Sequence, residues 1–428
     1  MIIRSVNDET AADKRLVNSA KAGSDRHAIE TGDAPPTNRL PKLPFAARPF
    51  WLVGFRPFFS LACLAGAALP VLWALVYGGV IAGPKISFAA VQWHAHEMLF
   101  GFGWAVLGGF LLTATKNWVQ VRGYHGAALM FLAAAWLFER FGMWFQDAWP
   151  PLLFLLSNWL FLVAIVALLL RTLIRHRRQD SFRDNIIFIV ALPLFAVAKY
   201  LLLSPDHFQA GAGMALGLFR LAFLLMLERT LTQFMKGVFQ VSILRHPGLD
   251  MPIKLSAAAL VFGSLMPAWP AASLNLMLAA LMLVRFAFWS PHRAMRRLEI
   301  AVMYLGYLAI VAQLLLDAAD RLARPAWIGA VPVHVFAFGV IGLVVPAMMV
   351  RIAKGHTGRK VVFEPWDKAV LYTMLLAVAL RIVAPQLNPG AYDVWINLAA
   401  ACWCAAFSIL GWRYIPFLLR PRVDGKAH

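Results

Sequence analysis

The sequence predicts an all-α protein, a polytopic transmembrane helical bundle of about twelve spans with both termini in the cytoplasm. The chain of 428 residues is 61% hydrophobic and only 14% charged, and its mean hydropathy of +0.67 lies far above that of soluble domains. Its apolar residues form continuous runs of about twenty, the length that a helix needs to cross a bilayer. These features exclude a soluble multidomain enzyme, and the runs lack the alternation of a membrane β-barrel.

Twelve apolar runs follow one another along the chain. The seventh and eighth are the weakest, because Pro267 and Pro270 leave only a short turn between them. The expected spans cover residues 57–80, 94–115, 125–145, 150–171, 184–204, 211–235, 253–269, 271–289, 299–317, 330–352, 366–385 and 393–415.

Three regions follow from this pattern. Residues 1–49 are expected to form a disordered cytoplasmic tail that leads into the membrane, because most of this segment carries charges of both signs, several prolines and few aromatic residues. Residues 50–415 form the transmembrane domain, and residues 416–428 form a short cytoplasmic tail. A signal peptide is not expected, because no apolar stretch precedes residue 50.

The net charge of +19 reflects an excess of basic residues in the loops on one side of the membrane. Alternate loops, beginning with the one between the second and third spans, hold 14 Lys and Arg residues, whereas the opposite loops hold three. Cytoplasmic loops of membrane proteins carry the excess of basic residues, so both termini are expected on the cytoplasmic side. The partner that this charge implies is the lipid bilayer, and no nucleic acid is expected.

Eight of the eleven histidines lie in the tails or in or beside loops, which leaves three candidates at membrane depth: His94, His96 and His334. All three are expected at a similar depth near the outer face, where imidazoles could hold haem or copper. Residues two apart on a helix point about 200° apart, so His94 and His96 cannot face one metal unless His94 still belongs to the preceding loop. His94 and Glu97 share a face, and one of these side chains could orient a ligand. Interfacial polar residues beside Trp93 would explain the same pattern.

Two spans carry adjacent unlike charges, Glu139 with Arg140 and Glu228 with Arg229. An isolated charge at membrane depth costs about 3 kcal/mol or more, so these side chains must be paired or hydrated. Ion pairs between helices satisfy this requirement, and so does a proton or ligand path. The second span also carries small residues that allow either close helix packing or room for a flat macrocycle: Gly101, Gly103, Gly108 and Gly109.

Four strings resemble the NnrS family across residues 50–415: GFRPFF at 54–59, WHAHEMLFGF at 93–102, GGFLLTATKNW at 108–118 and VHVFAFGVIGLVVPAMMVRIAKGHTGR at 333–359. The resemblance implies a bacterial inner-membrane protein that contains haem and copper and takes part in the response to nitric oxide and nitrosative stress. Nitric oxide or a nitrosylated species would then be its small-molecule partner.

The resemblance also ranks residues. It makes the three intramembrane histidines the best ligand candidates for haem and copper: His94, His96 and His334. It marks further motif residues without assigning them a role: Glu97, His356, Arg56 and Asn117.

The chain departs from the family pattern in two places. Tyr304 stands where family members commonly have a histidine in an HLGY-like string, and residues 115–118 lack the proline of a PNWTG-like string. The chain would therefore bind fewer metals than typical members, or use Tyr304 as a ligand.

Two other functions fit the sequence. A secondary transporter of a metal or small solute could use the intramembrane Glu and Arg pairs. A haem-copper oxidase also has twelve spans, but it needs six histidine ligands, and only three intramembrane histidines are present.

Overall fold

The computed structural model describes residues 44–84 and 87–426, and within these ranges the chain forms helices and no strand. Twelve of its helices are long and apolar enough to cross a membrane, which confirms the predicted all-α class and the number of spans. The expected weak pair is two separate helices divided at Met266 and Pro267. The expectation for the N-terminal tail falls mostly on residues 1–43, which lie outside the described residues.

Eight spans are single α-helices: α2 (Phe55–Tyr77), α5 (Ala127–Trp144), α6 (Pro151–Arg175), α7 (Ile186–Leu203), α8 (Phe208–Phe239), α10 (Ala268–Ala287), α12 (Leu298–Ala323) and α17 (Tyr392–Leu418). Four are composite: α3 (Ala90–His96) with η3 (Glu97–Gly103) and α4 (Trp104–Trp118), α9 (Pro247–Ala259) with η8 (Leu260–Leu265), α13 (Val331–His334) with η9 (Val335–Ile341) and α14 (Gly342–Gly355), and α15 (Pro365–Val378) with η10 (Ala379–Val383) and α16 (Ala384–Leu387).

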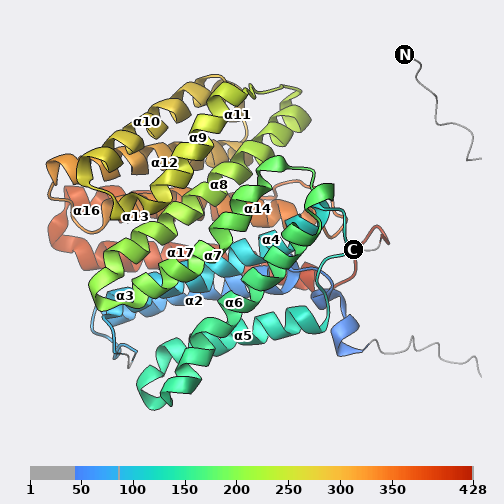
Figure 1. Cartoon of the computed structure of the whole chain (residues 1–428), viewed down its shortest axis with the longest axis horizontal. Helices are drawn as coiled ribbons and strands as arrows, with labels where there is room; N and C mark the ends of the chain where they lie inside the picture. The colour runs from blue at the N-terminus through green and yellow to red at the C-terminus, as the bar shows by residue number, and fades with distance from the viewer. Residues whose placement is uncertain (1–43, 85–86, 427–428) are drawn as a thin grey trace, which may run out of the picture. The chain divides into compact units, whose positions relative to one another are not determined.

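Three of the composite spans contain a π-helical segment: η3, η9 and η10. Such wider turns are rare and occur mostly at functional sites. The first begins directly after His96, the second begins directly after His334, and the third contains Arg381. Figure 1 shows the neighbouring short helices α3, α13 and α16 at one end of the bundle.

The helices α4, α8, α12 and α14 form the buried centre of the bundle. Around them, α5 packs on α6, α10 packs on α9 and α12, and α15 packs on α17 (Figure 1). The outer helices expose large apolar side chains such as Leu152 and Leu155 of α6. Lipid tails solvate such side chains, so this surface suits a protein that lies in a bilayer.

The glycines of the second span serve close packing. A Cβ added at Gly108 would lie 2.6 Å from Ile165, and one at Gly109 would lie 2.6 Å from the Cβ of Phe58. Neighbouring side chains therefore already fill the space beside α4. Of the two uses that the sequence allowed for these glycines, the structure supports packing and not room for a macrocycle.

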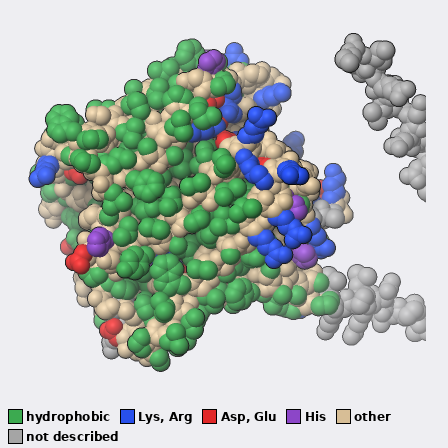
Figure 2. All heavy atoms as spheres, viewed as in Figure 1, with side chains coloured by type: hydrophobic (Ala, Val, Ile, Leu, Met, Phe, Trp, Pro, Cys, Tyr) green, Lys and Arg blue, Asp and Glu red, His purple; other side chains and the backbone are tan. Residues whose placement is uncertain are grey.

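Lys and Arg side chains gather at the end of the bundle where the C-terminus lies, as Figure 2 shows in the orientation of Figure 1. We call this the basic end. Because the helices alternate in direction, the loops after α4, α6, α8, α10 and α14 lie at this end. The helices α3, α13 and α16 lie at the other, which we call the opposite end (Figure 1).

Candidate functional site

The first polar cluster at the opposite end surrounds His96 and lies in the interior of the bundle. His96 Nδ1 is 3.1 Å from Glu97 Oε1, and His96 Nε2 is 3.3 Å from Glu139 Oε1 of α5. Arg140 bridges the two carboxylates at 3.2 Å from Glu97 and 3.0 Å from Glu139. Lys199 of α7 donates to Glu139 Oε1. We call these five residues the His96 cluster.

The His96 cluster encloses its histidine among charged groups. Two carboxylates face one guanidinium and one ammonium. The His96 ring is fully buried; its Nδ1 bonds to Glu97, whereas its Nε2 lies 3.3 Å from Glu139 Oε1 and makes no hydrogen bond to a described residue. A metal could reach Nε2 only after the Glu139 carboxylate had shifted.

Sequence reasoning missed Lys199. It lies inside the fifth expected span, five residues before its end, where a lone lysine is costly and must find a partner. That cost predicts a partner for the lysine, and the fully buried Lys199 does pair with Glu139 and also donates to the carbonyl of Asn158. The partner itself could not be deduced, because it lies 60 residues away on another helix.

The second polar cluster surrounds His334. Its Nδ1 bonds to the carbonyl of Ala330 at 2.8 Å, so this nitrogen carries the proton and Nε2 carries the lone pair. Arg381 donates to that Nε2 at 3.2 Å and to the Tyr392 hydroxyl at 3.1 Å. The guanidinium of Arg381 therefore covers the free lone pair of His334.

His94 belongs to this second cluster and not to the first. Its ring stacks on Trp73 with centroids 4.3 Å apart, and it interacts electrostatically with His334 and Arg381. His94 lies inside α3, so the two-residue offset points it away from His96. We call His94, His334, Arg381 and Tyr392 the His334 cluster.

The two clusters differ in what they offer a metal. The His334 cluster brings together two imidazoles, and the bond from Nδ1 to a backbone carbonyl is the usual support of a ligating histidine. In the other cluster, Glu97 bonds to Nδ1 of His96 and so orients His96 and not His94. Within residues 44–84 and 87–426, no group of three or more His, Cys, Asp or Glu side chains is arranged to hold a metal ion.

The intramembrane charges of α8 lie toward the basic end and are also paired. Glu228 lies 2.9 Å from both Arg285 and Lys254, and Arg229 donates to Asp184 at 2.6 Å. Interhelical ion pairs, the simpler of the two explanations offered by the sequence, thus account for the charges in both spans.

The remaining motif residues occupy the basic end. Arg56 donates to the carbonyls of Leu418 and Arg420 at 2.6 and 2.7 Å, which ties α2 to the end of α17. Asn117 and His356 line a pocket between α4, α8 and α14.

Tyr304, the residue in the position of a family histidine, is fully buried in α12. Its hydroxyl donates to the carbonyl of Trp289 at 2.7 Å. It is thus a buried side chain with a backbone partner, and it lies near the start of its helix, toward the basic end.

The fold and the clusters define a class: a multi-pass helical membrane protein with two polar clusters, rich in histidine and arginine, at one end of the bundle. The model of the NnrS protein family matches residues 49–422, nearly the whole chain. The chain therefore belongs to the NnrS family, as the sequence motifs predicted. No curated protein gives a significant match.

Proposed function

We propose that this protein acts in the response of a bacterial cell to nitric oxide and nitrosative stress, as a haem- and copper-binding protein of the inner membrane. Membership of the NnrS family supports the process and both cofactors. The observation that carries the copper part is the Nε2 lone pair of His334, which faces Arg381 in a region where His94 lies nearby.

In the His334 cluster, His334 and the nearby His94 would be the nitrogen ligands of a copper ion, once their rings had turned toward it. Imidazole is a suitable copper ligand, and the Ala330 carbonyl already fixes the His334 tautomer that leaves Nε2 as the donor. Copper binding would require Arg381 to release that nitrogen. When bound, copper would supply a redox-active centre able to interact with nitric oxide. The chain itself supplies the two donors, a stacked Trp73 behind His94 and a nearby cation.

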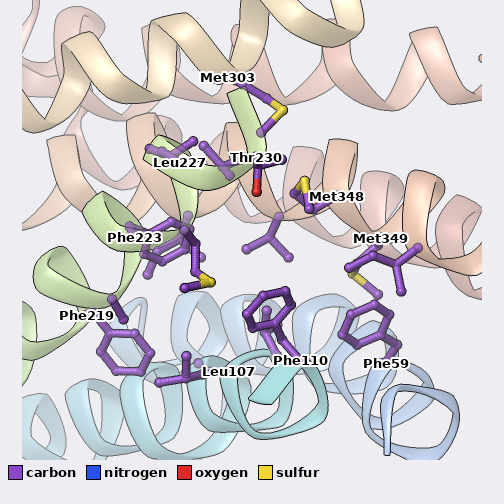
Figure 3. A pocket seen from close by; sticks show the side chains of 18 residues that line it. Phe59, Leu107, Phe110, Phe219, Phe223, Leu227, Thr230, Met303, Met348 and Met349 are labelled. Carbon is purple, nitrogen blue, oxygen red and sulfur yellow. The ribbon is translucent and has the colours of Figure 1, made fainter. Parts of the chain in front are cut away.

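Haem does not fit beside the second span in this arrangement. Neighbouring side chains occupy the space over Gly108 and Gly109. The apolar cavity between α4, α8 and α14 (Figure 3) encloses about 80 Å³ and has no histidine in its lining. Cofactor pockets commonly measure about 300–1,000 Å³. The proposal of haem therefore rests on family membership alone, and no step is derived through it.

Metal analysis of the purified, detergent-solubilised protein tests the copper assignment. We expect His94→Ala and His334→Ala to lose most of their copper, because each removes one of two donors. His176→Ala, a change beyond the end of α6, should keep the copper content of the unmodified chain. Full copper content in both His94→Ala and His334→Ala would overturn the assignment.

His96→Ala tests the third histidine that the sequence offered. As a ligand, His96 would have to leave Glu97 and Glu139, and its loss would then lower the haem or copper content as strongly as the loss of His334. As a member of a closed network, it would lower stability and leave metal content unchanged. The optical spectrum and the metal content together separate these outcomes.

One observation favours the alternative of a secondary transporter. The His96 cluster holds five ionisable groups in contact inside the bundle, as a path for protons or ions would need. Solute uptake that requires Glu139 or Glu228 and survives loss of His94 and His334 would support transport over metal-dependent nitric oxide defence.

A further inference from the structure

A pocket between the central helices opens at the basic end. It is a pocket of about 680 Å³ between α4, α8, α14 and the C-terminal segment. Its wall carries three arginines, Arg229 of α8, Arg351 of α14 and Arg422 after α17. None of the described residues that line the pocket is acidic. Neither the proposed cofactors nor the two polar clusters at the opposite end use this space.

One of these arginines has free donors, and a second adds positive charge. Arg229 bonds to Asp184 and Asn185 through Nη2, and its Nε and Nη1 are covered, with the guanidinium 4.1 Å from the ring centroid of Phe182. Arg351 makes no hydrogen bond or ion pair with any residue that the structure describes, and its guanidinium lies 3.4 Å from the ring centroid of Phe234. An anion in the pocket would accept hydrogen bonds from Arg351 and would be attracted by the charge of Arg229.

The lowered pKa of His356 is in keeping with a positive potential in the pocket. Burial and the nearby cations Lys116, Arg422 and Arg56 lower the pKa of His356 to about 4. The ring is therefore neutral near pH 7, and it adds a hydrogen-bonding group to the wall without adding charge.

The inner part of the pocket is apolar and leads into the cavity drawn in Figure 3. Both spaces are lined by the same five residues: Phe110, Met226, Thr230, Met348 and Ile352. Four of the five are apolar, and Figure 3 shows Phe110 and Met348 on facing sides of the cavity. A ligand that fits both parts has an anionic head and an apolar body.

We propose that the basic-end pocket binds the phosphate group of an anionic amphiphile, with Arg351 as its donor, Arg229 as a nearby positive charge and the apolar cavity of about 80 Å³ as the site of only the first part of its chain. Arginine presents a planar set of donors that matches a phosphate, and a charge-assisted hydrogen bond is among the stronger polar contacts. The basic end is also the end where positive side chains gather (Figure 2), which suits the headgroup level of an anionic leaflet. This site is independent of the metals in the proposed function.

The test is a titration of the full-length chain in neutral detergent with phosphatidic acid, followed by native mass spectrometry. We expect saturable binding that Arg351→Gln weakens about tenfold, the effect of losing one charge-assisted bond. Arg351→Lys should bind with intermediate affinity, because the charge is kept and the planar donor set is lost. Arg296→Gln removes an exposed charge at the same end, outside the pocket lining, and should bind like the unmodified chain.

Two further probes separate the sources of the phosphate. Inorganic phosphate alone should bind much more weakly than phosphatidic acid, and phosphatidic acid with short acyl chains should fall between them. If inorganic phosphate bound as tightly as phosphatidic acid, the proposal that the ligand is an amphiphile would be wrong. If zwitterionic phosphatidylcholine bound as tightly as phosphatidic acid, or if Arg351→Gln bound phosphatidic acid like the unmodified chain, the proposal of an anion site would be wrong.

Discussion

At the scale of single residues, neighbours in the sequence take different roles because of where a helix points them. The ring of His94 stacks on Trp73, near Arg381 and His334, whereas His96, two residues later, lies against Glu139. The π-helical segment that follows places Glu97 beside His96. Helical spacing predicted that the two histidines would not share one metal. It could not predict the partner of Glu97, because a wider turn changes the angular register of the residues after it.

Tyr304 gives a prediction at this scale. Tyr304→Phe removes a buried hydroxyl that donates to the Trp289 carbonyl, and we expect it to cost about 1 kcal/mol of stability, the typical worth of such a bond. The residue lies only about 9 Å along α12, at about 1.5 Å per residue, on the side away from the His334 cluster. The absorption spectrum and the metal content should therefore not change.

Thermal unfolding in detergent and metal analysis check this expectation, with Tyr372→Phe, an exposed tyrosine of α15, as the matched control. A lost haem band or a lower metal content in Tyr304→Phe would show that the phenol replaces the family histidine as a ligand.

At the scale of elements, buried ion pairs join helices that sequence analysis treats one at a time. Lys199 of α7 and Glu139 of α5 meet at His96 of α3. The cost of a charge in the membrane required a partner for Glu139, and that much was predictable. Which helix supplies the partner depends on the packing of α5, α6 and α7, for which a single sequence holds no direct signal.

The contact between Glu139 and Lys199 predicts that substitutions at these two residues have coupled effects on the stability of the protein. Glu139→Gln should destabilise the protein by about 3–5 kcal/mol, because it leaves buried Lys199 without a carboxylate and Arg140 with Glu97 alone. Lys199→Met should also destabilise it. The double variant Glu139→Gln with Lys199→Met should be more stable than the sum of the single effects, because it leaves fewer unpaired charges.

Thermal unfolding of the four proteins in one detergent measures this coupling. Arg175→Gln, at an exposed position of α6, should lie within about 0.5 kcal/mol of the unmodified chain. Strictly additive effects of the two substitutions would contradict a direct Glu139 to Lys199 pair.

At the scale of the whole molecule, the number of spans and the helical class were predictable because each span carries its own signal of length and apolarity. The residues at which individual spans begin and end were less predictable. The seventh span begins at Pro247 and not near residue 253, and α8 runs on to Phe239. The extension of the seventh span contains Asp250, whose carboxylate pairs with Arg285 of α10. A hydropathy window counts this residue as loop because it does not register the pairing.

The orientation of the bundle in the membrane follows from its charge and makes the last prediction. The basic side chains gather at one end (Figure 2), and the positive-inside rule places that end in the cytoplasm. Fusions after Arg178 and after Arg297 should therefore make a fluorescent reporter active in the cytoplasm. A fusion after Pro205, in the loop between α7 and α8, should make alkaline phosphatase active in the periplasm. The rule acts through the short loops beside each span, so the three sites must alternate as stated. A cytoplasmic result after Pro205, or a periplasmic one after either arginine, would reverse the assignment of the basic end, and the phosphate site proposed there would then face the wrong leaflet.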